Sequence, residues 1–327
     1  MPFFQSQIDS RLPIGTSLSF PGRRFIVLAL LFLGLQLSAS GQPPPRVVLA
    51  VLDFGDSALG RVASEKLASN LKHENDVIIL DHDQVRAAAR GAGYTNSLNL
   101  SLNEARDLGA ALGCDFFILG DAQTLRRSPS AGPIYFESYA SIFFVSARTG
   151  RLINWERPDF RAANALAAEQ SLISELSAFA VSNRSVRLIR IAQADERKER
   201  ALTFDQGDQQ TPIIEEAPTD DKPGEAEGLR LPRPYRRLLP AYPKTAAQAE
   251  VEATVDVLAD LDANGEVLRV SVARWAGFGL DEATIDTVRK LHFFPAMRNG
   301  VAIPIRVLLR YNFRKPPRRV IGEKGKG

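Results

Sequence analysis

Apolar residues follow two different patterns along the chain, one in residues 46–192 and another in residues 229–315, which indicates two folded regions. Residues 46–192 begin with the nearly continuous apolar run 47–52, and residues 59–71 carry apolar side chains at helical spacing. Such runs are typical of strands buried on both faces, and their alternation with helices predicts an α/β domain with a mixed sheet flanked by helices. The pattern predicts further strands at 77–80, 115–120, 135–145 and 152–155, and helices at 83–90, 102–112 and 163–191.

Residues 229–315 follow a different pattern. A period-two alternation at 251–257 predicts a strand, and Asp262-Ala263-Asn264-Gly265 predicts a tight turn into a partner strand at 267–275. Asp281 is placed to cap a helix at 282–291, and residues 303–313 alternate again. The pattern predicts a small antiparallel three-stranded sheet with helices on one side, and the whole chain is α+β in class.

A polar stretch separates the two regions. Residues 193–228 are rich in Asp, Glu, Gln and Pro, which predicts an acidic flexible linker. Four arginines among prolines follow at Arg230, Arg233, Arg236 and Arg237. Two interpretations stay open: the acidic and basic stretches pair loosely, or both are solvated. We expect residues 316–327 to form a basic, disordered tail.

The N-terminal residues have the layout of an export signal. Arg23 and Arg24 precede the apolar run 25–37, and Ser38-Ala39-Ser40-Gly41 offers small residues for cleavage. A helix over this run covers about 20 Å, which is short of the ~30 Å membrane core. Residues 1–41 are therefore a signal peptide or a signal anchor, and residues 42–45 a proline spacer. Both alternatives predict a periplasmic protein, either soluble after cleavage or anchored to the inner membrane by residues 25–37.

Charge and chemical motifs argue against several classes of function. The 41 Lys and Arg barely exceed the 38 Asp and Glu, so nothing favours nucleic acid as a partner. His82 lies between two aspartates, which a helix-capping turn explains better than a metal site, and Ser57 has the place of a helix cap. The single cysteine, Cys114, precedes an apolar strand and is expected to be buried and inert. With no nucleotide-binding or hydrolase motif either, we expect no enzyme, no cofactor and no metal.

Six motifs in the last quarter to third of the chain carry a family resemblance. They are Tyr242-Pro243 with Ala246, the turn 262–265, Gly279-Leu280-Asp281-Glu282-Ala283, Phe294-Pro295-Ala296, Asn299-Gly300 and Tyr311-Asn312-Phe313. Their order and spacing resemble the C-terminal domain of TonB energy transducers. The resemblance implies a three-stranded sheet with two helices on one face, at residues 229–315.

The resemblance also implies a function. Transducers of this family pair an exposed strand edge with a short segment of an outer-membrane receptor in transport across the envelope. Carried over, the binding residues are Val307, Leu309, Tyr311 and Phe313 on the last strand, with Tyr242 and Pro243 as the entry motif. Arg306 and Arg310 on the other face would tune the choice of partner. The prediction is a binding module at the end of a flexible arm.

One departure from the family keeps an alternative open. Its members usually carry a Ser and a His in the membrane helix that couple to inner-membrane motor proteins, and residues 25–37 have neither. The alternative is a periplasmic scaffold that links envelope proteins or peptidoglycan without a motor. A homodimer is compatible with either function.

The α/β region carries a second resemblance. Val51-Leu52-Asp53-Phe54, residues 81–85, Leu108-Gly109, residues 114–120 and Ala147-Arg148-Thr149-Gly150 resemble the N-terminal domain shared by TolB and the CsgG and LpoB group of periplasmic proteins. In that group the domain mostly serves protein contacts.

Overall fold

The computed structural model describes residues 46–72, 77–181, 187–194, 196–197, 214–217 and 228–315. The predictions for the signal region, the proline spacer and the basic tail lie outside these residues. Among the described helices, none combines the length and the apolar character needed to cross a membrane. Residues Arg46–Gly327 form one compact unit that contains both folded regions.

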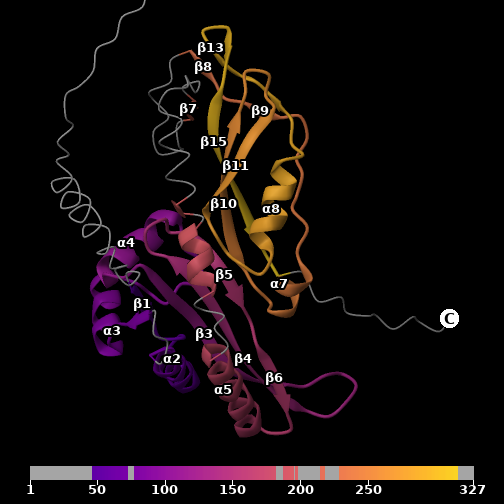
Figure 1. Cartoon of the computed structure of the whole chain (residues 1–327). Helices are drawn as coiled ribbons and strands as arrows, with labels where there is room; N and C mark the ends of the chain where they lie inside the picture. Colours follow the sequence, from indigo (N-terminus) through magenta and orange to yellow (C-terminus); the bar gives the residue numbers. More distant parts are fainter. Residues whose placement is uncertain are drawn as a thin grey trace, which may run out of the picture. The chain divides into compact units, whose positions relative to one another are not determined.

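The first region is an α/β domain around a mixed sheet in the order β2-β1-β3-β4-β5, with β6 also paired to β4 (Figure 1). β1 (Val47–Val51), β2 (Val77–Ile79) and β3 (Phe116–Arg127) are parallel. β4 (Tyr135–Ser146), β5 (Leu152–Glu156) and β6 (Asp159–Ala162) form the antiparallel half. The mixed sheet was predicted, but β6 was not, and β3 continues past its predicted end at residue 120 through polar residues that pair with β4.

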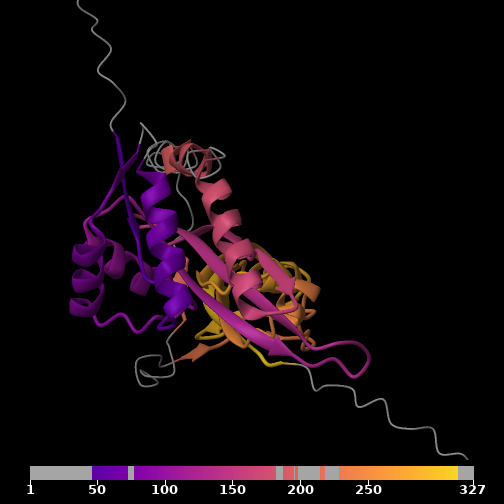
Figure 2. The same cartoon turned by 90° about the horizontal axis from the view of Figure 1, so that it is seen from below.

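Helices cover both faces of this sheet. Apolar side chains of α2 (Ala58–Leu71) and α5 (Ala165–Val181) pack in one core, and the two helices lie side by side (Figure 2). α3 (His82–Gly91) and α4 (Leu102–Leu112) pack in the other core. β3 shows why the sheet separates the cores: Phe116 and Ile118 face the first, and the alternate residues Phe117 and Leu119 face the second.

The helix ends follow the sequence closely. The Ser57 hydroxyl accepts from the backbone N–H of Gly60 at 2.8 Å, and the Asp81 carboxylate accepts from that of Asp83 at 3.0 Å, so both residues cap helices as predicted. α4 matches the predicted bounds, with Ser101 and Glu104 forming a capping box. Of the long helix predicted at 163–191, the structure describes α5 over Ala165–Val181 and helical residues at 187–194, and residues 182–186 lie outside the described residues.

The second region contains an antiparallel sheet in the order β11-β10-β15 (Figure 1). Its strands are β10 (Ala253–Leu261), β11 (Val267–Arg274) and β15 (Ile305–Phe313), and its helices are α7 (Lys244–Gln248) and α8 (Leu280–Val288). Two small ladders complete it: β8 (Leu229–Arg230) with β13 (Ala296–Arg298) and β14 (Val301–Ile303), and β9 (Arg233–Pro234) with β12 (Phe293–Phe294). The predicted α+β class is confirmed.

The predicted hairpin turn between β10 and β11 is confirmed in detail. The Asp262 carboxylate accepts from the backbone N–H of Asn264 and of Glu266, both at 2.8 Å. Gly265 has φ +86°, and a Cβ there would lie 1.9 Å from the carbonyl oxygen of Phe293. Only glycine meets both demands.

The predicted capping role of Asp281 is wrong. The N-cap of α8 is Gly279, the helix begins at Leu280 and ends at Val288, and Asp281 lies inside its first turn. The buried Asp281 carboxylate instead accepts from the backbone N–H of Ala276 at 2.9 Å and of Gly277 at 2.8 Å. The positive φ of Gly277 and Gly279 folds the loop that precedes the helix back over the helix start. The Asp281 carboxylate therefore lies close to the backbone N–H groups of this loop and holds it in place.

Candidate functional site

The outward edge of β15 is the candidate binding site, and its backbone geometry follows from one hydrogen bond. The N–H of Ala217 donates to the carbonyl oxygen of Arg306 at 2.8 Å, on the side of β15 opposite β10. Since the backbone groups of successive strand residues alternate in direction, those of Leu308, Arg310 and Asn312 face the same way. Among the described residues, β7 (Glu215–Glu216) is the only strand on this side, and it pairs only with Ile305 and Arg306.

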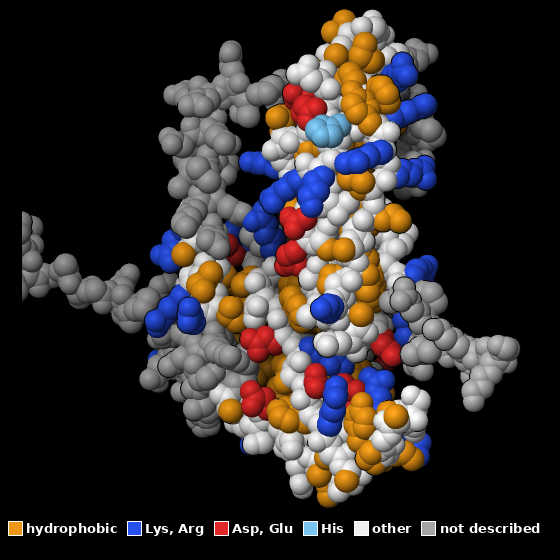
Figure 3. All heavy atoms as spheres, turned by 90° about the vertical axis from the view of Figure 1, so that its right-hand side faces the viewer, with side chains coloured by type: hydrophobic (Ala, Val, Ile, Leu, Met, Phe, Trp, Pro, Cys, Tyr) orange, Lys and Arg blue, Asp and Glu red, His pale blue; other side chains and the backbone are white. Residues whose placement is uncertain are grey.

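Besides its backbone edge, β15 contributes side chains to a groove of about 450 Å³. Val307 and Phe313 are buried in the core, whereas Leu309 and Tyr311 are half-buried and line the groove. Apolar side chains from other segments add Leu238, Tyr242, Leu291 and Phe293, and four arginines border the groove, Arg236, Arg237, Arg310 and Arg314. In the upper part of Figure 3, apolar side chains of the C-terminal domain lie among Lys and Arg side chains. Apolar surface with a cationic border fits an extended segment that carries acidic residues.

The structure brings five of the eight predicted site residues together. Tyr242, Leu309, Arg310, Tyr311 and Phe313 line the groove. Of the other three, Val307 belongs to the core, Pro243 is the N-cap of α7, and Arg306 lies at the end of the strand that β7 covers. The binding role of these residues stays a prediction.

The two predicted tyrosines also have structural roles. The Tyr242 hydroxyl donates to the carbonyl oxygens of Ala246, at 3.4 Å, and Val251, and its ring lies 6.2 Å from that of Phe313. Burial is the main cause that raises the pKa of Tyr242, and burial also raises the pKa of Tyr311. Both phenols are therefore neutral hydrogen-bonding groups at physiological pH.

Arg306 and Arg310 form matching ion pairs across the sheet. Arg306 donates to the two carboxylate oxygens of Asp260 at 2.6 and 3.0 Å, and Arg310 to those of Asp256 at 2.8 and 3.0 Å. Both aspartates are buried. The pKa of Arg306 is raised, mainly by its hydrogen bond to Asp260. The arginines therefore neutralise buried carboxylates, and their role in the choice of partner stays a prediction.

Sequence reasoning missed part of the site. The groove residues Leu238, Leu291 and Phe293 come from segments that carry no strand pattern of their own, and Arg236 and Arg237 were noted only as a basic stretch. β7 was missed because it lies inside the predicted acidic linker. The apolar pair Ile213-Ile214, unusual in that segment, was the available signal.

The C-terminal domain is joined to the α/β domain by an apolar cluster. Trp275 is 2% exposed and its ring stacks on Phe143 of β4, with centroids 5.8 Å apart. Phe278 contacts Phe143 and also Trp155 of β5, at centroid distances of 5.6 and 5.0 Å. Gly277 permits this approach, since a Cβ there would lie 2.7 Å from the Phe143 ring.

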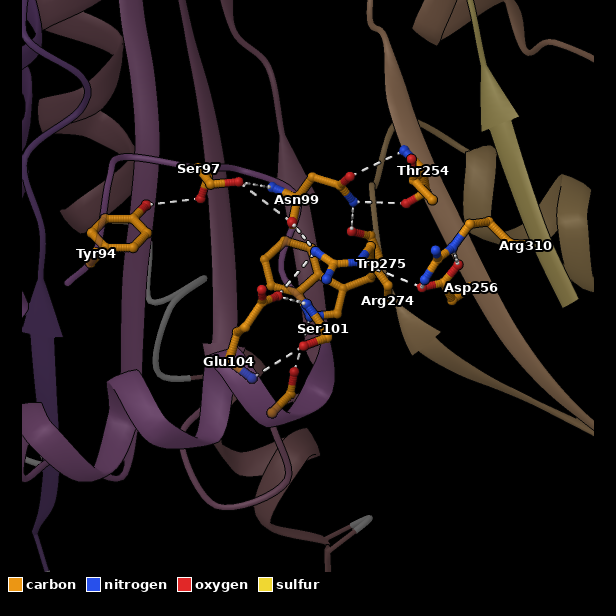
Figure 4. Close-up of polar contacts among 11 residues, drawn as sticks. Tyr94, Ser97, Asn99, Ser101, Glu104, Thr254, Asp256, Arg274, Trp275 and Arg310 are labelled. Carbon is orange, nitrogen blue, oxygen red and sulfur yellow. Dashed lines mark hydrogen bonds and ion pairs between the residues drawn. The ribbon is translucent and has the colours of Figure 1, made fainter. Parts of the chain in front are cut away.

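Polar contacts surround this cluster (Figure 4). The Asn99 side-chain amide donates to the carbonyl oxygens of Thr254, at 2.9 Å, and Trp275, at 2.6 Å. Arg274 donates to the Asn99 carbonyl oxygen at 2.8 Å and pairs with Glu104 at 3.0 Å. The described residues of the two domains therefore share one interface, and the flexible arm stays a prediction, since most of residues 193–228 lie outside the described residues.

The described parts of the predicted linker also contact the folded domains. Glu196 pairs with Arg148 at 2.7 Å, and Ile214–Ala217 lies against β15. At these residues the segment departs from a solvated linker. Three acidic side chains of its described part form ion pairs, Glu196 with Arg148, Glu215 with Arg298 and Glu216 with Arg306.

His82 takes part in an ion-pair cluster at the carboxyl end of β1. Its Nε2 lies 2.8 Å from an Asp53 carboxylate oxygen, which Arg86 also approaches. No group of three metal-binding side chains occurs in the described part of the chain. Cys114 is half-buried, and burial raises the pKa of its thiol to about 12.

Comparison with known proteins places the second region in a family. Residues 239–314 match the family described as Gram-negative bacterial TonB protein, C-terminal. Protein TonB of Xanthomonas campestris pv. campestris is 39% identical over 75 residues, which are 23% of this chain and 34% of that protein. Residues 239–314 are therefore a TonB-type C-terminal domain, as predicted. The match spans about a third of the length of the TonB relatives.

Solved structures add weaker likenesses. The solution structure of the Pseudomonas aeruginosa TonB C-terminal domain is 22% identical, covers 27% of this chain and 90% of its own, and has a TM-score of 0.23. A lipoprotein of Neisseria meningitidis is 14% identical, covers 42% of this chain and all of its own, and has a TM-score of 0.29. Neither likeness carries an argument at these TM-scores, and the TolB-like and CsgG-like resemblance of residues 46–192 stays a prediction.

Proposed function

We propose that this chain is a non-enzymatic adaptor of the Gram-negative cell envelope that binds an extended segment of an outer-membrane receptor along β15. The observation that carries the proposal is the outward-facing backbone of Leu308 and Asn312, next to a groove for alternate side chains, in a TonB-type domain. Main-chain hydrogen bonds to the edge would supply affinity, and the groove would select side chains. The periplasm is the compartment in which such a segment is accessible.

The edge has the properties that strand addition requires. Leu308 is 42% exposed, and no backbone group of the described residues accepts a hydrogen bond from its N–H or from that of Asn312. On its other side β15 is paired with β10 over its whole length, from Ile305 to Phe313. The partner would therefore add to a rigid, preformed edge, which lowers the entropic cost of binding.

A crosslinking experiment in cells tests the proposal. A photo-reactive amino acid at position 308 should capture an outer-membrane receptor, identified by mass spectrometry. The same residue at position 268, a leucine 62% exposed on the opposite outer strand β11, is the matched control and should not. Equal capture from both positions, or no receptor from position 308, contradicts the proposal.

A pair of substitutions at one position tests the backbone contribution. Leu308→Pro removes the outward N–H but leaves the neighbouring bonds to β10, and proline is tolerated on edge strands. Leu308→Ala removes the same side chain and keeps the N–H. With the photo-reactive residue moved to the exposed position 312, we expect receptor capture to be lost only with proline, while the melting temperature shows that both variants remain folded.

The alternative is an envelope scaffold without motor coupling. The observation that favours it is the interface between the domains, because a module fixed to a second domain cannot reach as far as one on a flexible arm. A photo-reactive residue at the exposed Val62 of α2 should then capture an envelope protein other than the receptor. Capture of no envelope protein from this position contradicts the scaffold.

A further inference from the structure

The candidate binding edge is already in contact with a segment of the same chain. β7 runs parallel to β15, with Glu215 opposite Ile305 and Glu216 opposite Arg306. The Ala217 N–H donates to the Arg306 carbonyl oxygen at 2.8 Å. The segment Ile214–Ala217 therefore uses the outward backbone of β15 in the way expected of an added strand.

Two ion pairs explain why this segment lies in this register. The Glu215 carboxylate pairs with Arg298 of β13, and Glu216 approaches Arg306 at 3.8 Å. The side chains of Arg298 and Glu215 are 41% and 39% exposed, and that of Glu216 is 77% exposed. Exposed ion pairs of this kind contribute little to stability. The charges thus select the register but hold the strand weakly, as a displaceable strand requires.

The segment and an added partner strand would need the same space. Continuing the parallel register by one residue places Ala217 opposite Val307. A partner strand bonded to the outward groups of both Arg306 and Leu308 must pass through that place. The groove at residues 309–314 lies farther along the same strand and is lined by none of the β7 residues.

We propose that β7 is an intramolecular occupant of the receptor-binding edge, which a partner segment must displace. This inference rests on the proposed function of β15. It also specifies the chemistry of the partner: an extended segment with carboxylates placed to replace Glu215 at Arg298 and Glu216 at Arg306. The apparent receptor affinity then equals the intrinsic affinity multiplied by the fraction of molecules in which β7 is undocked.

A peptide binding experiment tests the occupancy without any receptor. The probe is a fluorescein-labelled peptide of residues 211–221, added to the chain in an anisotropy titration. Glu215→Arg places a cation beside Arg298 and should release β7 from the edge. The peptide, which keeps its own Glu215, should then bind at least about tenfold more tightly than to the unchanged chain, since a strand docked nine times in ten lowers apparent affinity by that factor.

Charge reversal on both sides provides the matched control. The double variant Glu215→Arg, Arg298→Glu restores an opposite-charge pair within the chain. A peptide with arginine in place of Glu215 should bind this double variant weakly and the single variant Arg298→Glu tightly. Asp107→Arg, on the exposed side of α4, should leave the binding of the unchanged peptide as it is in the unsubstituted chain.

The outcomes separate this inference from the proposed function. Equal peptide affinity for the unsubstituted chain and Glu215→Arg, or no binding to Glu215→Arg, overturns the occupancy of the edge by β7. If Glu215→Arg binds the peptide more tightly while position 308 captures no outer-membrane receptor, the occupancy stands and the receptor proposal fails.

Discussion

Asn99 of the α/β domain and Thr254 of β10 form two reciprocal hydrogen bonds. The Asn99 amide donates to the Thr254 carbonyl oxygen at 2.9 Å, and the Thr254 N–H donates to the Asn99 side-chain oxygen at 3.0 Å. The side chain of Asn99 thereby imitates a strand neighbour at the start of β10. One residue between two helices of the α/β domain thus fixes the C-terminal domain in position.

Replacing Asn99 should weaken the contact between the domains. Asn99→Ala leaves the N–H and carbonyl of Thr254 and the carbonyl of Trp275 without their partner, which should cost about 2–3 kcal/mol of unfolding free energy. Both tryptophans of the chain, Trp155 and Trp275, lie at this contact, so their fluorescence in a urea titration measures the loss. Asn103→Ala, at an exposed position of α4, is the control. An unchanged unfolding midpoint for Asn99→Ala would contradict the prediction.

The sequence predicted the elements of the fold better than their contacts. The turn at 262–265 and the caps at Ser57 and Asp81 depend on residues within a few positions of one another, and local chemistry is sufficient to place them. The role of Asn99 depends on residues more than 150 positions away, and no local pattern indicates it. β7 is similar, because its two paired residues acquire a partner only once β15 has formed.

The candidate site shows the same division. Period-two alternation correctly placed Leu309 and Tyr311 on one face of the last strand and Arg306 and Arg310 on the other. The alternation could not show that Asp256 and Asp260 lie directly opposite the two arginines, because that depends on the register between β10 and β15.

Trp275 should be the largest single contributor at the interface between the domains. Trp275→Ala removes a fully buried ring and should cost about 3–5 kcal/mol. Trp275→Phe keeps most of the packing but loses the Nε1 bond to the Gly150 carbonyl oxygen, 3.0 Å long, so it should cost less. Leu268→Ala, at a 62% exposed position, should change the unfolding free energy by at most about 0.5 kcal/mol. Equal effects of the alanine and phenylalanine variants would show that the ring packs loosely.

The stability of the protein should depend on the ionisation of Asp281. The pKa of this carboxyl is raised from 3.8 to about 6, and burial is the largest cause. The hydrogen bonds from the backbone N–H groups of Ala276 and Gly277 lower the pKa but do not offset the effect of burial. The folded state therefore binds a proton more tightly than the unfolded state. The resulting stabilisation is complete below pH 4 and is lost as the pH rises to about 6, by an amount on the order of 2–3 kcal/mol.

Asp281→Asn isolates this dependence because it removes the titrating group. The unfolding free energy of the unsubstituted chain minus that of the variant should fall from about pH 4 through pH 6 and become level at about pH 7. A difference that does not change over this range would show that the carboxyl titrates normally.

The ion pair between Arg306 and Asp260 should show strong coupling in a double-mutant cycle. Arg306→Ala leaves the Asp260 carboxylate, which is 4% exposed, without its counterion and should cost about 2–3 kcal/mol. Adding Asp260→Ala removes the uncompensated charge, so the double variant should be more stable than Arg306→Ala alone. Chemical denaturation of the four proteins gives the coupling energy, and additive effects would contradict the pairing.

Cys114 should report unfolding through its reactivity. A thiol with a pKa of about 12 is almost entirely protonated at pH 8, whereas an unfolded cysteine with an ordinary pKa carries an appreciable thiolate fraction. Alkylation by iodoacetamide should therefore be roughly a thousandfold slower in the folded protein than in concentrated urea. Glutathione, alkylated under both conditions, corrects for the effect of urea on the reagent. The raised pKa of Cys114 is due mainly to burial, because its thiol makes only a long 3.9 Å contact to the Gly109 carbonyl oxygen. Fast alkylation of the folded protein would therefore mean that the loop between α4 and β3 exposes the thiol.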